Sequence, residues 1–240
     1  MPGEGDPETE VVFVGEGPGY NEDRLGRPFV GAAGNLLNEL LSAIGWRREQ
    51  VFITNVVKCR PPDNRDPQPD EIAACAPYLR RQLEVLDPAL VITLGRHSLQ
   101  TFMPGARIGA AHGTQRPVDP TTGAPNATAY AMYHPAAALR QGTLRQTMLE
   151  DMAAVPELLI RARAGRAAVA QPVIVDGQVV DAVEQAPRGA PLASQQPAAE
   201  PQSSVPQHPS APEHAGWPES ELAAAAATPS QDPDNQMELF

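Results

Sequence analysis

Short continuous apolar runs alternate along the chain with longer segments in which apolar residues recur at helical spacing. The apolar runs predict strands at residues 11–14, 51–57, 90–94 and 129–133. The helical spacing predicts helices at residues 35–44, 70–86, 98–102 and 144–164. Continuous apolar strands separated by helices are typical of a parallel sheet covered on both faces. We therefore expect a three-layer α/β/α fold around a central, mainly parallel four-stranded sheet.

Residues 166–240 form a segment of different composition. They hold two basic residues against ten acidic ones, a net charge of −8, and 11 of the chain's 27 prolines. Residues 1–165 carry a net charge of only −3, so most of the chain's −11 lies in the tail. A segment rich in Ala, Pro, Gln and Ser with few aromatics cannot bury a core. We expect one folded domain at 1–165 and a disordered acidic tail at 166–240.

Composition argues against several classes of protein. No apolar run reaches the roughly 18 residues that would span a bilayer, so we expect no membrane contact. The first residues lack the basic start and apolar stretch of a signal peptide, and two cysteines cannot form a disulfide scaffold. These features predict a protein of the reducing cytoplasm. The charge of −11 argues against a nucleic-acid binder unless basic residues gather locally.

The candidate chemistry lies just beyond the predicted strands. Ligands of parallel α/β folds bind outside the carboxyl ends of the strands. We expect four segments at that rim: Gly15–Gly19, Asn55–Arg60, Gly95–His97 and His134–Pro135. Asn55 could present its amide to a planar ligand or cap a turn, and His134 could be catalytic or structural.

The glycine-rich segment Gly15–Gly19 does not match known phosphate-binding loops. The third glycine of a dinucleotide-binding fingerprint would fall at Tyr20, and no helical pattern opens directly after the turn. A Gly-Lys-Ser/Thr sequence for a nucleoside triphosphate is absent as well. The segment therefore predicts a tight turn that brings the backbone close to a ligand.

Several short motifs are more informative together than singly, because their order along the chain is specific. They are Gly15-Glu16-Gly17-Pro18-Gly19, Glu22-Asp23, Gly26-Arg27-Pro28-Phe29-Val30-Gly31, Thr54-Asn55-Val56-Val57-Lys58-Cys59-Arg60-Pro61-Pro62 and His134-Pro135. In this order the chain resembles the family 4 uracil-DNA glycosylases, the iron–sulfur members of that superfamily, over about residues 3–160. The resemblance implies a monomeric, monofunctional hydrolase that flips deoxyuridine out of DNA and cleaves its N-glycosidic bond.

The resemblance assigns roles to individual residues. Phe29 would stack on the flipped uracil, and Asn55 would hydrogen-bond its O4/N3 edge. His134 would hydrogen-bond O2 as negative charge builds on the departing base. Backbone amides of Gly17 and Gly19 would hold O2 or the 3′ phosphate.

Contacts with DNA are expected from two further groups of residues. Leu139 and Arg140 stand where the family inserts a wedge into the vacated base stack, although Leu139 is equally consistent with a core residue. A local cationic face would offset the acidic total. We expect that face to contain Lys58, Arg60, Arg65, Arg140 and Arg145.

The acid that positions the attacking water stays open. The Asp that does so in the best-known uracil-DNA glycosylases corresponds to Gly17. Either Glu16 or Glu22 contributes instead, or the enzyme relies mainly on stabilising the uracil anion. Glu22 could also exclude the methyl group of thymine.

The family holds a [4Fe–4S] cluster through four cysteines. Cys59 and Cys75 match the downstream pair, whereas the upstream Cys-x-x-Cys is absent. One expectation is that the natural protein starts roughly 20–30 residues earlier. The other is a lineage that lost the cluster and kept two thiols. An upstream reading frame without Cys-x-x-Cys would contradict the first expectation.

The last five residues resemble the short peptide by which bacterial repair proteins bind the sliding clamp. Gln236 would anchor the backbone, while Met237, Leu239 and Phe240 would fill an apolar pocket. A disordered tether of about 70 residues would let the peptide act while the domain scans DNA. The alternative is an apolar terminus that arose by chance.

Two rival functions remain beside the glycosylase. One is a catalytically weak member of the same superfamily that binds DNA or uracil. The other is an unrelated α/β nucleotide-binding protein recruited through its tail.

Deletion of residues 236–240 tests the clamp hypothesis. The shortened protein should no longer co-elute with the sliding clamp on gel filtration, because the apolar anchors are gone. Its activity on free uracil-containing oligonucleotides should match that of the full chain. Loss of both properties would show instead that the peptide is structural.

Overall fold

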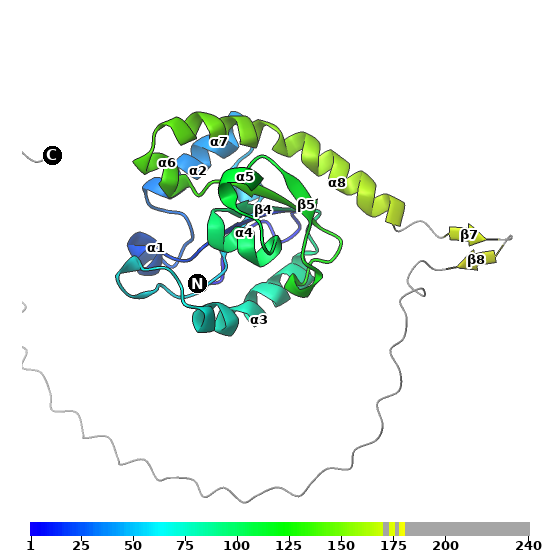
Figure 1. Cartoon of the computed structure of the whole chain (residues 1–240), viewed down its shortest axis with the longest axis horizontal. Coiled ribbons are helices and arrows are strands. Elements are labelled where there is room, and N and C mark those ends of the chain that lie inside the picture. The colour runs from blue at the N-terminus through cyan, green and yellow to red at the C-terminus, as the bar shows by residue number, and fades with distance from the viewer. Residues whose placement is uncertain (170–172, 176–177, 181–240) are drawn as a thin grey trace, which may run out of the picture. The chain divides into compact units, whose positions relative to one another are not determined.

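Figure 1 shows a computed structural model of the chain, which describes residues 1–169, 173–175 and 178–180. Most of the predicted tail, including the peptide at 236–240, lies outside these residues. The predicted domain end at 165 falls inside the last helix, which continues to Val169. Residues 173–180, an apolar stretch of the tail, contain two short strands paired with each other.

A six-stranded sheet lies at the centre of the fold. Its strands are β1 (Glu4–Gly5), β2 (Val11–Gly15), β3 (Phe52–Asn55), β4 (Leu90–Leu94), β5 (Gln115–Pro117) and β6 (Thr128–Met132). The order across the sheet is β1-β3-β2-β4-β6-β5. The inner four strands are parallel, and β1 and β5 pair antiparallel at the edges. The predicted α/β fold and its four parallel strands are confirmed, and the two edge strands are additional.

Helices and short 3₁₀ turns connect the strands. The α-helices are α1 (Tyr20–Leu25), α2 (Ala32–Ala43), α3 (Pro69–Leu86), α4 (Arg96–Phe102), α5 (Ile108–Ala111), α6 (Pro135–Arg140), α7 (Thr143–Ala153) and α8 (Val155–Val169). The 3₁₀ turns are η1 (Arg48–Gln50), η2 (Pro62–Asn64) and η3 (Pro120–Thr122). The strands paired in the tail are β7 (Val173–Val175) and β8 (Gln178–Val180).

The sheet is buried on both faces because its side chains alternate between two apolar cores. In β2, Phe13 packs in the core formed with α2, α6, α7 and α8, whereas Val12 and Val14 pack in the core formed with α3, α4 and α5. Figure 1 shows α6, α7 and α8 along one side of the domain and α3 along the other. This burial on both faces explains the continuous apolar runs of the inner strands.

Two helix predictions were wrong in detail. The single helix predicted at 144–164 is two helices that meet at Ala154. Pro156 lies just after this point, where its ring and missing N–H are incompatible with a continuing helix. Helix α1 does begin directly after Gly19, contrary to expectation, although Tyr20 still replaces the third glycine of a dinucleotide loop.

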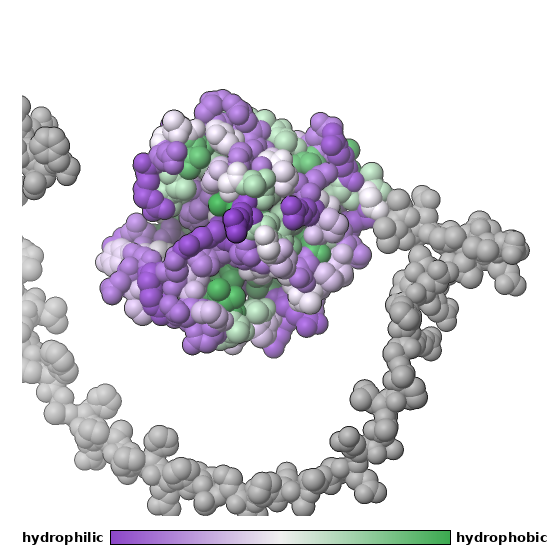
Figure 2. Space-filling model, viewed as in Figure 1, coloured by the Kyte–Doolittle hydropathy of each residue, from purple (hydrophilic) through white to green (hydrophobic). Residues whose placement is uncertain are grey.

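The described residues include no helix that is long and apolar enough to cross a bilayer. Figure 2 shows hydrophilic residues spread over the visible face of the domain, with smaller hydrophobic areas between them. The apolar residues of the inner strands are instead enclosed: Phe13, Ile53 and Ile92 have no exposed surface. The hydrophobic effect therefore stabilises the sheet that carries the strand ends.

Candidate active site at the carboxyl ends of the strands

A cavity of about 540 Å³ opens at the carboxyl edge of the parallel strands. The strand register brings Gly15 beside Asn55, and Gly95 and His134 follow the neighbouring strands β4 and β6. Nine of the residues given a role from the sequence line the cavity. They are Glu16, Gly17, Gly19, Glu22, Phe29, Asn55, Arg65, His134 and Arg140. The expectation of one common rim is therefore met.

Asn55 presents an unpaired hydrogen-bond acceptor to the cavity region. The residue is 3% exposed, and its Oδ1 is buried without a hydrogen-bond partner. A buried acceptor without a partner destabilises a folded protein by about 1–3 kcal/mol. A side chain at Gly15 would place Cβ only 2.4 Å from this oxygen, so glycine keeps the approach to it open. A ligand that donates a hydrogen bond would satisfy Asn55.

His134 presents a hydrogen-bond donor in the same cavity. Burial lowers the pKa of its imidazole to about 4, and the charge of Arg140 contributes to the decrease. The ring is therefore neutral at pH 7. Its Nδ1 accepts a hydrogen bond from the backbone N–H of Ala136 at 3.1 Å, at the start of α6. The single ring proton must then lie on Nε2, which becomes the donor.

Phe29 supplies an aromatic surface beside His134. The two ring centroids lie 5.5 Å apart with an interplanar angle of 29°. Phe29 is 6% exposed and has a φ of 52°, a left-handed conformation that is rare for residues with a side chain. Its backbone passes close to α2, where a Cβ on Gly34 would lie 1.8 Å from the Phe29 carbonyl oxygen. Glycine at position 34 therefore allows the loop that carries Phe29 to pack against α2.

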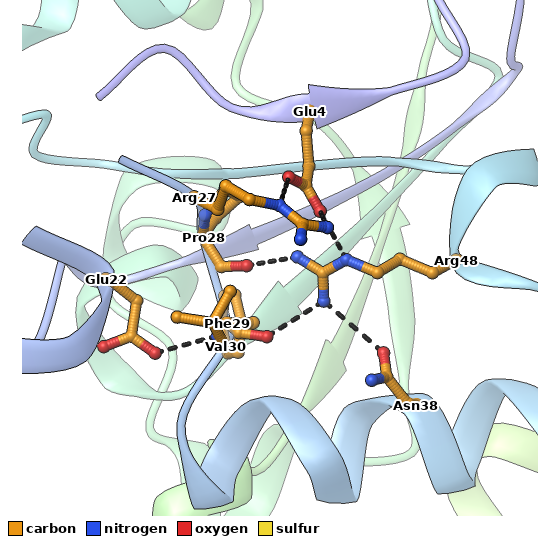
Figure 3. A network of polar contacts seen from close by, with 8 residues as sticks. All are labelled: Glu4, Glu22, Arg27, Pro28, Phe29, Val30, Asn38 and Arg48. Carbon is orange, nitrogen blue, oxygen red and sulfur yellow. Dashed lines mark hydrogen bonds and ion pairs between the residues drawn. The ribbon is translucent and has the colours of Figure 1, made fainter. Parts of the chain in front are cut away.

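The two candidate acids have different surroundings. Glu22 holds the Phe29 loop, because its Oε1 accepts a hydrogen bond from the backbone N–H of Val30 at 3.0 Å (Figure 3). The same oxygen accepts a second one from the N–H of Gly31, also at 3.0 Å. The carboxylate of Glu16 has no hydrogen bond among the described residues, and its side chain is 33% exposed. Burial raises the pKa of Glu16. Of the two, Glu16 has the carboxylate that is available to a water molecule.

His97 was placed at the rim from the sequence but was given no role. Its Nε2 lies 3.8 Å from Glu16 Oε2 and 3.6 Å from Asp66 Oδ1, and it is buried without a hydrogen bond. A positive charge on this ring would lower the pKa of Glu16, whereas Asp66 raises it. The sequence indicates that His97 is at the rim, because the residue lies at the start of α4, directly after β4.

Comparisons with known proteins agree with this geometry. A family model described as the uracil DNA glycosylase superfamily matches residues 2–154. Type-4 uracil-DNA glycosylases from Sulfurisphaera tokodaii and Saccharolobus solfataricus are 48% and 47% identical to the chain, covering 67% and 66% of it and 74% and 76% of their own lengths. The chain belongs to the type-4 uracil-DNA glycosylase family. The predicted resemblance is confirmed.

A further type-4 enzyme and a less similar type-5 enzyme also match the chain. A type-4 uracil-DNA glycosylase from Thermotoga maritima is 46% identical over 62% of this chain and 78% of its own length. A type-5 enzyme from Thermus thermophilus is 36% identical over 43% of this chain and 53% of its own length. The lower identity and coverage agree with the prediction of family 4.

Lys58 does not fit the predicted role in contacting DNA. The side chain of Lys58 is buried, and its Nζ donates hydrogen bonds to Thr54 Oγ1 at 2.9 Å, the Asn55 carbonyl at 2.8 Å and Gln82 Oε1 at 2.6 Å. Burial lowers the pKa of its ammonium group to about 8. The sequence could not show this, because the partner Gln82 comes from α3.

The expected cationic face is smaller than predicted. Arg65 pairs with Glu71, and Arg145 pairs with Glu39, so both are partly neutralised. Arg60 lies over the ring of Tyr20 at 5.3 Å and donates to Asn64 at 2.7 Å. Arg140 lines the cavity and forms no ion pair among the residues that the structure describes. Arg65 and Arg96 also line the cavity but are paired with Glu71 and Asp66, so within the described part of the chain Arg140 is the unpaired arginine of this lining.

Leu139 is not a core residue. Its exposed fraction is 54%, on helix α6 next to Arg140. An exposed leucine beside a cavity can enter an apolar gap that a partner offers. The structure thereby removes the alternative that Leu139 is buried in the core.

Cys59 follows Lys58 in the sequence, and Cys75 contacts the backbone of Lys58. Cys59 is exposed, and the Cys75 thiol accepts a hydrogen bond from the Lys58 N–H at 3.2 Å. The amino group of Met1 donates to the Lys58 carbonyl at 2.6 Å, so the first printed residue lies at the same loop. Two thiols provide half of the four ligands that a [4Fe–4S] cluster requires. The printed chain therefore does not complete the ligand set.

The protonation of His134 can be measured directly. Its imidazole should titrate near pH 4 by NMR, far below the usual 6.5, because burial opposes the charged form. Since the folded-state pKa is below the unfolded one, stability should fall as the pH drops from about 6.5 towards 4. The variant His134→Gln identifies the resonance. A midpoint near 6.5 would contradict a buried, neutral ring.

Proposed function

We propose that the chain hydrolyses the N-glycosidic bond of deoxyuridine in DNA and releases uracil, the first step of base excision repair. The observation that carries the proposal is one cavity with a buried, unpaired Asn55 Oδ1 and a neutral His134 beside the Phe29 ring. Uracil has a planar face, an N3–H donor and carbonyl acceptors. These groups complement the three side chains.

Asn55 would distinguish uracil from cytosine. Its Oδ1 would accept the N3–H of uracil, and its amide N–H would donate to O4. Cytosine presents an acceptor at N3 and a donor at N4. The N3 acceptor would face the Asn55 Oδ1 acceptor, and the N4 donor would face the amide N–H donor, so neither hydrogen bond could form. Buried polar groups left unpaired in this way give strong discrimination between substrates.

His134 would stabilise the leaving group. Cleavage of the N-glycosidic bond leaves negative charge on uracil, part of it at O2. The Nε2–H of a neutral imidazole is already oriented, because Nδ1 is occupied by the Ala136 N–H. A donor fixed in advance in a desolvated site typically lowers the barrier by about 3 kcal/mol.

Glu16 would orient the attacking water, and Glu22 would hold the loop that carries Phe29. The free carboxylate of Glu16 and its raised pKa in the cavity wall support this division. The backbone N–H groups of Val30 and Gly31 donate hydrogen bonds to Glu22 Oε1, so this oxygen is not free to bind a water molecule. The oxygen of the attacking water would form a bond to C1′ of the sugar, while the C1′–N1 bond breaks and its electron pair leaves with the uracil anion. The proton released by the water would pass to the Glu16 carboxylate.

DNA would be held by a small number of groups at the cavity mouth. Arg140 and Arg60 would contact phosphates, and the backbone amides of Gly17 and Gly19 would hold O2 or the 3′ phosphate. The exposed Leu139 would fill the space that the flipped nucleotide leaves in the stack. Base flipping requires such compensation, because unstacking costs about a few kcal/mol.

The enzyme would act without a lyase step. A lyase needs a free amine nucleophile, and Lys58 is the single lysine of the chain. Its ammonium group is buried and donates three hydrogen bonds to the protein. The amine is therefore not available to the sugar, which supports a monofunctional glycosylase.

Cys59 and Cys75 would bind iron as two of the four ligands of the family's [4Fe–4S] cluster. In the sequence, Cys59 and Cys75 precede and follow the segment that supplies Pro61, Asn64 and Asp66 to the cavity wall. The sequence contains no third cysteine. The uracil-binding groups Asn55, Phe29 and His134 do not depend on the cluster for their chemistry.

Substitution of the base-binding residues tests the function. The wild-type chain should release uracil from single- and double-stranded oligonucleotides, and His134→Ala should lose about 100-fold or more in rate. Asn55→Ala should lose rate and discrimination against cytosine, measured on matched uracil and cytosine oligonucleotides. Retention of the oligonucleotide without product would support a binding protein, and an unchanged rate in both variants would exclude this site.

Comparison of Glu16→Gln with Glu22→Gln separates the roles of the two acids. Glu16→Gln should lower kcat with little change in KM, because it removes only the base or orienting group for water. Glu22→Gln should also raise KM, because the loop of Phe29 loosens. Glu150→Gln, an exposed site on α7, serves as the control. Equal effects of both variants on kcat alone would contradict the division.

A further inference from the structure

The loop that carries Phe29 is held from two sides by side chains far apart in the sequence (Figure 3). Glu22 binds the backbone N–H groups of Val30 and Gly31. On the other side of the loop, Arg48 binds the carbonyl groups of the two residues before Val30, which are Pro28 and Phe29. Its Nη1 donates to the Phe29 carbonyl at 3.0 Å, and its Nη2 donates to the Pro28 carbonyl.

The guanidinium group of Arg48 is itself fixed. It extends from η1, and its side chain is only 11% exposed. Its Nε donates to Glu4 Oε1 at 2.5 Å in β1, and Nη1 lies 3.4 Å from Asn38 Oδ1 in α2. The positive charges of Arg27 and Arg48 keep the pKa of Glu4 low, so the carboxylate stays charged. Arg48 therefore connects an edge strand, a helix and the loop.

The conformation of Phe29 requires such support. Its φ of 52° is one that residues with a Cβ rarely adopt, and strained conformations persist where the surroundings enforce them. Two carbonyl groups directed at one planar guanidinium fix the peptide planes before and after the Phe29 Cα. Only arginine offers several donors in a rigid plane, and a lysine ammonium could not make all four contacts in this geometry.

We propose that Arg48 is a positioning residue for uracil excision, which holds the Phe29 ring in the orientation that stacks on the flipped base. The inference rests on the stacking role proposed above for Phe29. Arg48 does not line the cavity and acts through the loop alone. A displacement of the ring would misalign uracil relative to Asn55 and His134.

Arg27 is a matched control in the same network. It donates to the same Glu4 carboxylate, with Nε 2.7 Å from Oε2, but its side chain is 61% exposed. Its recorded hydrogen bonds go to Glu4 and not to the loop carbonyls. The variant Arg27→Gln therefore removes a charge next to Glu4 and leaves the contacts of Arg48 with Pro28 and Phe29 in place.

The test is a double-mutant cycle on single-turnover rates with a uracil-containing single-stranded oligonucleotide. The variants are Arg48→Gln, Arg48→Lys, Phe29→Ala, Arg27→Gln and the double variant Arg48→Gln/Phe29→Ala. Arg48→Gln should lose about 100-fold, because small misplacements at a reacting centre have large effects. In the Phe29→Ala background the same change should cost less than about threefold, since Arg48 then has no ring to position. Arg27→Gln should keep the wild-type rate.

Thermal melting is recorded for every variant, so that a loss of folding is not mistaken for a loss of positioning. Arg48→Lys keeps the charge facing Glu4 and should fold, yet it should still lose rate because it cannot hold both carbonyls. The inference would be overturned if the rate loss of Arg48→Gln/Phe29→Ala equalled the product of the two single losses. It would also be overturned if the Arg48 variants kept the wild-type rate. If Phe29→Ala alone keeps the wild-type rate, the stacking role itself is wrong, and that outcome is distinct from a failure of Arg48.

Discussion

Parallel pairing of β3, β2, β4 and β6 brings their carboxyl ends to one edge, and the whole site depends on this alignment. The register places Gly15 beside Asn55, and the neighbouring strands deliver Gly95 and His134 to the same edge. Apolar cores on both faces of the sheet stabilise the alignment, so the groups that contact a ligand need not stabilise it themselves.

The site includes several features that reduce the stability of the fold. Asn55 Oδ1 is buried without a partner, and Phe29 has a left-handed backbone that costs about 1–2 kcal/mol. Burial and the charge of Arg140 lower the pKa of His134 to about 4, which opposes protonation of the ring. Such unsatisfied and strained groups are concentrated at functional sites, where a bound ligand supplies the missing contact. Under the proposed function, the N3–H of uracil would supply the donor that Asn55 Oδ1 lacks.

The net charge of the whole chain does not describe the charge of its folded part. Most of the −11 lies after residue 165, yet the folded part is not basic either, and several of its arginines are paired with acids. Arg140 stands at the cavity without an ion pair among the described residues, and Arg60 stacks on Tyr20. Affinity for DNA would then come from a few local contacts and from base capture, with a weak dependence on salt.

The sequence by itself determined the four parallel strands, the position of the rim and the family, because apolar runs and motif order are local properties of the chain. Only the tertiary structure decided the direction of each side chain. Lys58 turns inward because α3 supplies Gln82, and Glu22 differs from Glu16 because the loop at Val30 folds back onto it. Contacts between residues distant in sequence leave no periodic signal, so these roles appear only when the chain is folded.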